Sequence, residues 1–259
     1  MSSVLVTGGT GVLGRAVVQR LLDSGHQVRL ASRRPPPAGP RRYAWVTVDY
    51  RNGEGLDTAL RAADAVIHCA GDLRGKVDRA LLTAVRTGGG PHLLYISIIG
   101  VDRVPLAYYR LKLAAERAIE NSGLPYTILR TTQFHDLIRC GLAAAARLPL
   151  MPVPDLSGQP IAVRDVANRL VELATRAPRG YARDLGGPEV RTVRDLAKAY
   201  LRATARRRQL LPIRLPGKAF VGYRRGGHLT PNHADGRITF EEYLATHPAP
   251  ARISYRGAR

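Results

Sequence analysis

The stretch VLVTGGTGVLGRAVVQRLLDSG, residues 4–25, contains three features in direct succession. A short apolar run, residues 4–6, is typical of a buried β-strand. Glycines then stand three residues apart, at Gly8, Gly11 and Gly14. After them, apolar residues recur three and four positions apart up to Gly25, which indicates an amphipathic helix with a glycine stop. A strand, a tight glycine turn and a helix in this order predict the first unit of a parallel α/β sheet.

The same alternation continues along the first part of the chain. Expected strands are the apolar segments 27–32, 43–50, 64–71, 92–100 and 124–132. Expected helices are the amphipathic segments 56–63, 77–90 and 105–123. Four prolines in residues 33–42 exclude regular structure there. Strictly alternating short strands and helices predict an α/β fold, with a parallel sheet covered by helices on both faces.

The character of the sequence changes after about residue 150. Residues 151–160 are rich in proline, and amphipathic helices are expected over 163–175 and 192–208, the second with a capping pattern at Thr192 and Asp195. We therefore expect a sheet domain over residues 1–150 and a smaller C-terminal lobe over 151–259. In α/β enzymes such a lobe usually builds the substrate pocket.

The composition leaves the class of partner open. The chain has 259 residues, a formal net charge of +20 and a pI near 11, so a nucleic acid or an anionic lipid has to be considered. Only four of its 40 basic residues are lysines, however, and the arginine clusters are short, separated and free of interleaved aromatic residues. An arginine-rich coding composition explains the charge as well, and we favour it over nucleic-acid binding.

Membrane, export and metal signals are weak. No apolar run approaches the roughly 18 residues of a membrane span, and no basic segment precedes the first apolar stretch. Cys69 and Cys140 form neither a metal-binding spacing nor a disulfide framework. A cytoplasmic protein with reduced thiols, no bound metal and a small-molecule substrate is therefore expected.

The glycine turn favours a dinucleotide ligand. Glycines between a strand and a helix let backbone N–H groups approach a pyrophosphate at the helix N-terminus. The second strand ends in Ala31, Ser32, Arg33 and Arg34, without the acidic side chain that usually holds the ribose of NAD. Arginines suit the 2′-phosphate of NADP, so NADP is expected over NAD. Asp49, after the third strand, is a candidate partner for the adenine amino group or a loop cap.

Four motifs together resemble the short-chain dehydrogenases/reductases. They are TGGTGVLG at 7–14, HCAG at 68–71, Ser97 at the end of the fifth strand and Tyr108-x-x-x-Lys112. The T-G-x-T-G-x-x-G spacing and the short C-terminal lobe are similar to the atypical, NmrA-like branch of NAD(P)-binding proteins. HLLYISIIGVDRVPLAYYRLKLAAE and LPYTILRTTQFHD strengthen the resemblance, which covers residues 1 to about 170.

The resemblance implies a Rossmann-type doubly wound sheet and a reductase site. Tyr108 would donate or accept the proton, Lys112 would hold the nicotinamide ribose, and Ser97 would bond the substrate oxygen. Ala70 and Gly71 would border the adenosine ribose. The implied pyrophosphate loop consists of Gly8, Thr10, Gly11, Val12, Leu13 and Gly14. HCAG departs from the common N-N-A-G, and the catalytic Asn of the regular reductases has no counterpart.

Two functions follow from this resemblance. One is an NADP-dependent oxidoreductase that reduces a small carbonyl or quinone-like compound. The other is a non-catalytic NADP(H)-binding sensor or regulator, because many atypical members bind the cofactor without demonstrated chemistry.

Helical phase gives independent information on the lysine. At about 100° per residue, Lys112 lies in the middle of an apolar stripe with Tyr108 and Ile119, opposite Arg110. A lysine in that position is costly to bury unless it is paired, so we expect a polar partner. Its ammonium, helped by an oxidised nicotinamide, should lower the pKa of Tyr108 from about 10. Tyr109 is out of phase and should contact the lobe or the substrate entrance.

Overall fold

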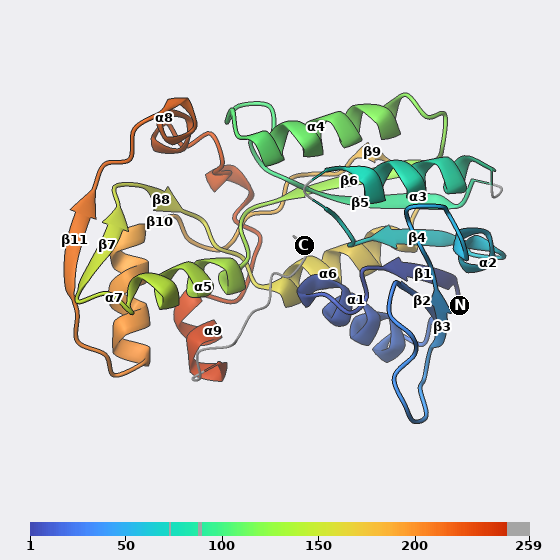
Figure 1. Ribbon diagram of the computed structural model, residues 1–259, viewed down its shortest axis with the longest axis horizontal. Coiled ribbons are helices and arrows are strands. Elements are labelled where there is room, and N and C mark those ends of the chain that lie inside the picture. Colours follow the sequence, from blue (N-terminus) through green and yellow to red (C-terminus); the bar gives the residue numbers. More distant parts are fainter. Residues whose placement is uncertain (73, 88–89, 248–259) are drawn as a thin grey trace.

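The computed structural model describes residues 1–72, 74–87 and 90–247. A seven-stranded parallel sheet is its centre, in the order β3-β2-β1-β4-β5-β6-β9 (Figure 1). The strands are β1 (Ser3–Thr7), β2 (Gln27–Ser32), β3 (Ala44–Thr47), β4 (Ala65–His68), β5 (His92–Ile98), β6 (Tyr126–Thr131) and β9 (Gly180–Tyr181). The predicted α/β Rossmann-type sheet is confirmed. Its strand order reverses between β1 and β4, where doubly wound sheets bind their ligands.

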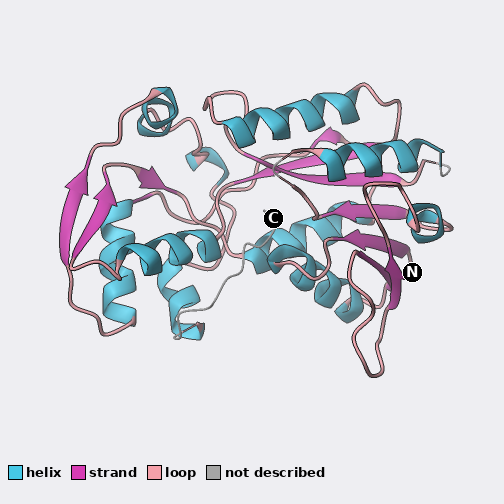
Figure 2. Cartoon of the chain, in the orientation of Figure 1, coloured by secondary structure: helices cyan, strands magenta, loops and turns pink. Residues whose placement is uncertain are grey.

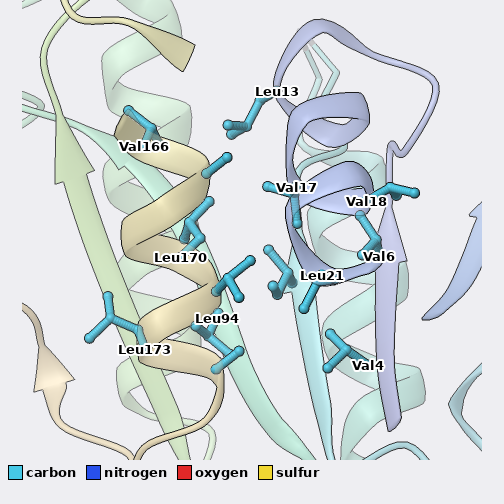
Figure 3. Close-up of a cluster of buried hydrophobic side chains, with 14 of the residues drawn as sticks. Val4, Val6, Leu13, Val17, Val18, Leu21, Leu94, Val166, Leu170 and Leu173 are labelled. Atoms are coloured by element: carbon cyan, nitrogen blue, oxygen red, sulfur yellow. The ribbon is translucent and has the colours of Figure 1, made fainter. Parts of the chain in front are cut away.

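Helices cover both faces of this sheet. One face carries α1 (Val12–Asp23) and α6 (Val163–Ala174), and the other carries α2 (Leu56–Leu60), α3 (Lys76–Thr87) and α4 (Ala107–Glu120). In the first layer, Leu13, Val17 and Leu21 of α1 meet Leu170 of α6 over Leu94 of the sheet (Figure 3). The amphipathic faces predicted for these helices are therefore the faces that form the core.

The remaining elements form a second group beside the carboxyl ends of the strands (Figure 2). Its strands pair as β7 with β11 and β8 with β10, and its core includes Met151, Leu196, Tyr200 and Phe240. These elements are α5 (His135–Ala145), β7 (Leu150–Pro154), β8 (Ser157–Gly158), β10 (Arg191–Thr192), α7 (Val193–Ala203), β11 (Gln209–Ile213), α8 (Lys218–Arg224), a 3₁₀ turn (Pro231–His233) and α9 (Phe240–Thr246).

The chain after residue 150 contributes to both groups. Helix α6 packs along α1, and β9 extends the main sheet next to β6. Five of the six buried residues of α6 are Val166, Leu170, Val171, Leu173 and Ala174, and this apolar face is what places α6 beneath the sheet. The sheet core is thus assembled from both ends of the sequence.

Helix α5 was not predicted from the sequence. Its buried face consists of His135, Arg139 and Leu142. Two of these three residues are polar, so the sequence lacks the apolar spacing by which an amphipathic helix is recognised. Tertiary partners satisfy them. His135 Nε2 donates to the Ile238 carbonyl (2.9 Å), and Arg139 donates to the His247 carbonyl (2.9 Å).

Candidate nucleotide and active site

The glycine loop packs against the segment after β4, backbone to backbone. Gly8 has a φ of +66°, and a Cβ there would lie 2.6 Å from the Ala70 nitrogen. A Cβ at Gly14 would lie 2.2 Å from the Gly8 carbonyl oxygen, while the Gly11 N–H donates to that oxygen (2.8 Å). Only glycine fits at Gly8 and Gly14 without displacing backbone, so the predicted tight turn is present.

The N-terminus of α1 opens at this turn without a side-chain cap. Gly11 is the N-cap and makes no side-chain hydrogen bond, so the first N–H groups of the helix, at Val12, Leu13 and Gly14, have no acceptor within the helix. Such N–H groups and the helix dipole favour an anion. Thr10 is exposed beside them and accepts a hydrogen bond from Arg15 through its carbonyl (2.8 Å). The loop is therefore shaped as a phosphate cradle.

The end of β2 presents two free cations. Ser32 is buried, and its hydroxyl accepts from the Arg34 N–H (3.1 Å), which shapes the turn. Arg33 and Arg34 are exposed, and their guanidinium groups form no ion pair with any residue that the structure describes. Asp49 is already paired with Arg51, which donates from Nη2 (2.9 Å) and Nε (3.2 Å) and lowers the pKa of the carboxyl. The adenine role of Asp49 stays a prediction.

Lys112 is buried, with 6% of its surface exposed, as helical phase predicts. Its Nζ donates to the Tyr95 hydroxyl (3.0 Å) and to the Ile96 carbonyl (3.2 Å), both on β5. Burial lowers the pKa of Lys112, and the charge of Asp78 opposes that shift. An ammonium has three N–H donors, and two of them are used by described residues. The third remains for a ligand at the carboxyl end of β5.

The two tyrosines at the start of α4 have different surroundings. Tyr109 is buried, accepts from Gln133 Nε2 (3.2 Å) and meets Tyr223 of α8 edge-on, with ring centroids 6.2 Å apart. Its predicted contact with the C-terminal elements is confirmed. The inward stripe of α4 includes Tyr109 rather than Tyr108, because α8 covers the helix start and adds a surface there. Tyr108 is half-buried and packs against the cluster of Val101, Val104 and Tyr109, which Ile98 at the end of β5 also contacts.

The protein's own groups do not produce the expected lowering of the Tyr108 pKa. Burial raises that pKa, and the charges of Asp78 and Asp72 add to the shift. Lys112 gives its donors to Tyr95 and to a carbonyl instead. Tyr95 cannot replace Tyr108 as a proton donor to a substrate, because Tyr95 is fully buried. Tyr108 thus keeps its phenolic proton and can donate it.

Ser97 is the most informative polar group of the site. Its side chain is 1% exposed, and its Oγ has no hydrogen-bond partner among the described residues. A buried hydroxyl without a partner costs about 1–3 kcal/mol. It follows Ile96, whose carbonyl accepts from Lys112, so both groups lie at the end of β5. Among the described residues, the Ser97 hydroxyl therefore has an unused hydrogen-bond donor and acceptor.

A buried polar chain behind Lys112 was not predicted from the sequence. Thr7 Oγ1 and His68 Nδ1 lie 2.6 Å apart, and His68 Nε2 lies 3.0 Å from Asp78 Oδ1. The His68 ring stacks on Tyr95 at 5.8 Å. Asp78 lies in the first turn of α3, where acidic residues are common because they interact favourably with the helix dipole. Its position in the sequence therefore does not indicate a buried partner.

The described residues contain neither a metal site nor a membrane span. No cluster of three or more His, Cys, Asp or Glu side chains among them is arranged to hold a metal. Among the same residues, every helix is too short or too polar to cross a bilayer.

Comparison with known proteins agrees with this geometry. A family model described as NAD(P)H-binding matches residues 8–177, from the glycine loop past α6. The chain belongs to this NAD(P)H-binding family of atypical short-chain dehydrogenases/reductases. The matched range includes the three glycines of the loop, HCAG, Ser97 and the Tyr108-x-x-x-Lys112 pair, and it extends beyond residue 150 into α6 and the elements around it.

Individual relatives share the fold and parts of the sequence. A (4-alkanoyl-5-oxo-2,5-dihydrofuran-3-yl)methyl phosphate reductase of Streptomyces griseus is 30% identical over 74% of this chain and 70% of its own. The chloroplastic protein High chlorophyll fluorescence phenotype 244 of Arabidopsis thaliana is 28% identical over 75% of this chain, which spans 54% of that relative. An NADPH complex of the Escherichia coli quinone oxidoreductase QOR2 superposes with a TM-score of 0.78 at 18% identity, covering 94% and 99% of the two chains. At that identity the superposition shows the fold.

Proposed function

We propose that this protein is an NADP-dependent reductase of a small carbonyl or quinone-like substrate. One observation carries the proposal: the buried Lys112 ammonium bonds to Tyr95 and Ile96 of β5 and keeps one N–H free, while Ser97, the next residue of the same strand, has a buried hydroxyl without a partner among the described residues. Tyr108, one helical turn before Lys112, supplies a protonated phenol and packs against the same small cluster as Ile98 at the end of this strand. Such a reduction needs three groups: a hydrogen-bond donor for the cofactor ribose, a hydrogen-bond donor for the substrate oxygen and a source of a proton.

The residues present fit the cofactor of the family. Gly8 and Gly14 let the loop close tightly on the Ala70 backbone and on itself, where a Cβ would clash. The first N–H groups of α1, at Val12 and Leu13, are left without a side-chain cap beside this turn. These residues would hold the pyrophosphate, and Ala70 and Gly71 would border the adenosine. Arg33 and Arg34 would bind a 2′-phosphate.

At the reacting end, Lys112 would hold the nicotinamide ribose with its free N–H. Held there in its reduced form, the nicotinamide would supply the hydride of the reduction. Ser97 donates its hydroxyl proton in a hydrogen bond to the substrate oxygen and so stabilises the negative charge that develops there. Tyr108 then transfers its phenolic proton to that oxygen, and Lys112 stabilises the phenolate that remains.

The named relatives support this proposal. The name of the Streptomyces relative states reduction of an oxo-dihydrofuran phosphate, and the Escherichia coli protein is named as an NADPH-dependent quinone oxidoreductase. Both names describe reductions of conjugated carbonyl compounds, which matches a site with a proton donor and an oxygen-binding hydroxyl.

The second candidate function is a non-catalytic NADP(H) sensor. It is favoured by the bond of Lys112 to Tyr95 and by the raised pKa of Tyr108, since neither activates Tyr108 toward proton exchange. The two functions differ in turnover, while cofactor binding is common to both.

Tyr108→Phe distinguishes them. With NADPH and a panel of quinones, enals and ketones, we expect wild-type protein to oxidise NADPH and Tyr108→Phe to lose at least about 100-fold in kcat, because general acid catalysis contributes that much. NADPH affinity should be unchanged. Tyr109→Phe is the matched control, because it removes a hydroxyl that bonds Gln133 instead. Wild-type rates no higher than those of Tyr108→Phe would contradict the reductase and leave the sensor.

A further inference from the structure

We propose that Asp78 is a positioning residue for this site: it is the buried counter-charge that keeps the Lys112 ammonium charged and in place at the end of β5. The role of Lys112 toward a ribose rests on the proposed function. The electrostatic link between Asp78 and Lys112 does not, because it is a property of the protein without cofactor.

The contacts form a continuous chain from α3 to α4. Lys112 donates to the Tyr95 hydroxyl (3.0 Å), the Tyr95 ring stacks on His68, and His68 Nε2 lies 3.0 Å from the Asp78 carboxylate. Asp78 and Tyr95 also line the same cavity. His68 is itself bonded to Thr7, the residue before Gly8. The chain therefore ties the lysine to the strand that carries the glycine loop.

The other groups around Lys112 are weaker counter-charges than Asp78. Glu116, on α4, is bonded through both oxygens to Arg130 (2.6 and 3.0 Å). The thiol of Cys69, after β4, is neutral because burial raises its pKa to about 12. Burial also raises the pKa values of Tyr95 on β5 and Tyr108 on α4, which are therefore neutral phenols.

His68 on β4 is a further neighbour, but it is a base and cannot balance a cation. It supports Asp78 instead, because its hydrogen bond favours the ionised carboxylate. The charge of Lys112 acts in the same direction, and together these interactions lower the pKa of Asp78 although burial alone would raise it.

The cavity beside Asp78 offers, among the described residues that line it, no carboxylate that could replace this charge. A cavity of about 130 Å³ lies between α3 and α4, and His68, Asp78 and Tyr95 line its inner end. Its other walls include the apolar side chains of Leu81, Leu111, Ala115 and Ile119. An isosteric Asp78→Asn side chain fits the same space but leaves the ammonium buried without a partner of opposite charge, which is costly.

Lysine NMR measures the link directly. The chain has only four lysines, Lys76, Lys112, Lys198 and Lys218, so a ¹³C,¹⁵N-lysine-labelled sample gives few signals, and Lys112→Arg assigns the one of interest. Without cofactor, we expect the titration midpoint of Lys112 to fall by about one pH unit or more in Asp78→Asn, a roughly tenfold loss of proton affinity.

Three variants make the test decisive. Asp57→Asn is the matched control, since Asp57 is an exposed first-turn acid on the neighbouring helix α2, and it should leave the midpoint unchanged. Asp78→Glu keeps the charge and should restore most of the midpoint. If Asp78→Asn does not fold, Tyr95→Phe is the second variant. It removes the hydroxyl that accepts from Lys112 and should also lower the titration midpoint of Lys112.

A midpoint in folded Asp78→Asn or Tyr95→Phe that equals the wild-type value would overturn the proposal. Where turnover exists, the basic limb of the kcat/KM profile should move to lower pH in Asp78→Asn by the same amount. A lowered midpoint in protein that shows no turnover would refute the reductase function and leave the counter-charge role intact.

Discussion

Arg33 and Arg34 follow β2 with guanidinium groups that are unpaired within the described residues. We predict that Arg33→Ala/Arg34→Ala weakens NADPH binding roughly tenfold or more and leaves NADH binding nearly unchanged, because only NADPH carries a phosphate for charge-assisted bonds. Fluorescence titration of both cofactors measures this.

The control for that pair is Arg41→Ala/Arg42→Ala, which removes the same charge from exposed positions of the same loop. It should weaken NADPH and NADH only slightly, NADPH a little more because of its extra phosphate charge, and the effect should vanish at high salt because long-range attraction is screened. Equal affinities of wild-type protein for NADPH and NADH would contradict the NADP preference.

Ser97→Ala should change stability and activity in opposite directions. Removing a buried hydroxyl that has no partner among the described residues leaves the free energy of unfolding unchanged or raises it by about 1 kcal/mol. The same change removes the hydrogen bond to the substrate oxygen, so kcat should fall about 100-fold. Urea unfolding and steady-state kinetics measure the two effects, and a marked loss of stability would show that the hydroxyl serves the fold instead.

At the scale of elements, the turn between β1 and α1 is the sharpest test of the cofactor cradle. Gly8→Ala combines a positive φ with a Cβ 2.6 Å from the Ala70 nitrogen, so it should destabilise the protein by several kcal/mol or displace the loop and abolish NADPH binding.

Gly25→Ala separates the two causes, since Gly25 has a φ of +75° but a Cβ added there would meet no described heavy atom within 4 Å. It should cost only about 1–2 kcal/mol of backbone strain and retain cofactor affinity. Similar losses of NADPH affinity in both variants would mean that the close approach of Gly8 to Ala70 has no part in binding.

At the scale of the whole molecule, three buried histidines couple stability to pH. His92, His135 and His228 lie on the sheet, in the C-terminal core and over the β5 end, and burial lowers the pKa of each. The unfolded chain binds protons near pH 6.5 that the folded chain does not, so their stability contribution is full above that pH and is lost as the pH falls.

The free energy of unfolding should therefore decrease between pH 7 and pH 5, with a slope of up to about 4 kcal/mol per pH unit when all three histidines contribute. Urea unfolding at half-unit intervals measures it. Carboxylates with lowered pKa values lose their contribution at lower pH, so this window reports on the histidines. A flat profile from pH 7 to pH 5 would show that they are protonated in the folded protein as well.

Much of the fold could be predicted because its signals are local. The glycine spacing at residues 8–14 and the alternation of apolar strands with amphipathic helices need only neighbouring residues to be interpreted. The inward position of Lys112 follows from helical phase alone in the same way. Helix α5 escaped prediction because His135 and Arg139 on its buried face are satisfied by residues about a hundred positions away.

Local sequence therefore determined the parallel sheet, the glycine cradle and a buried lysine that requires a partner. Tertiary packing decided which partner the lysine has. Tyr95 on β5 bonds to Lys112, and Asp78 on α3 lies beside Tyr95 in the same cavity. The packing of α3 beside α4 over β5 brings these three separate segments together. Packing also placed α6 and β9 on the sheet and covered Tyr109 with α8, leaving Tyr108 nearer the surface. Helix phase and strand alternation are properties of a few consecutive residues, whereas the pairing of buried charges depends on which distant faces meet.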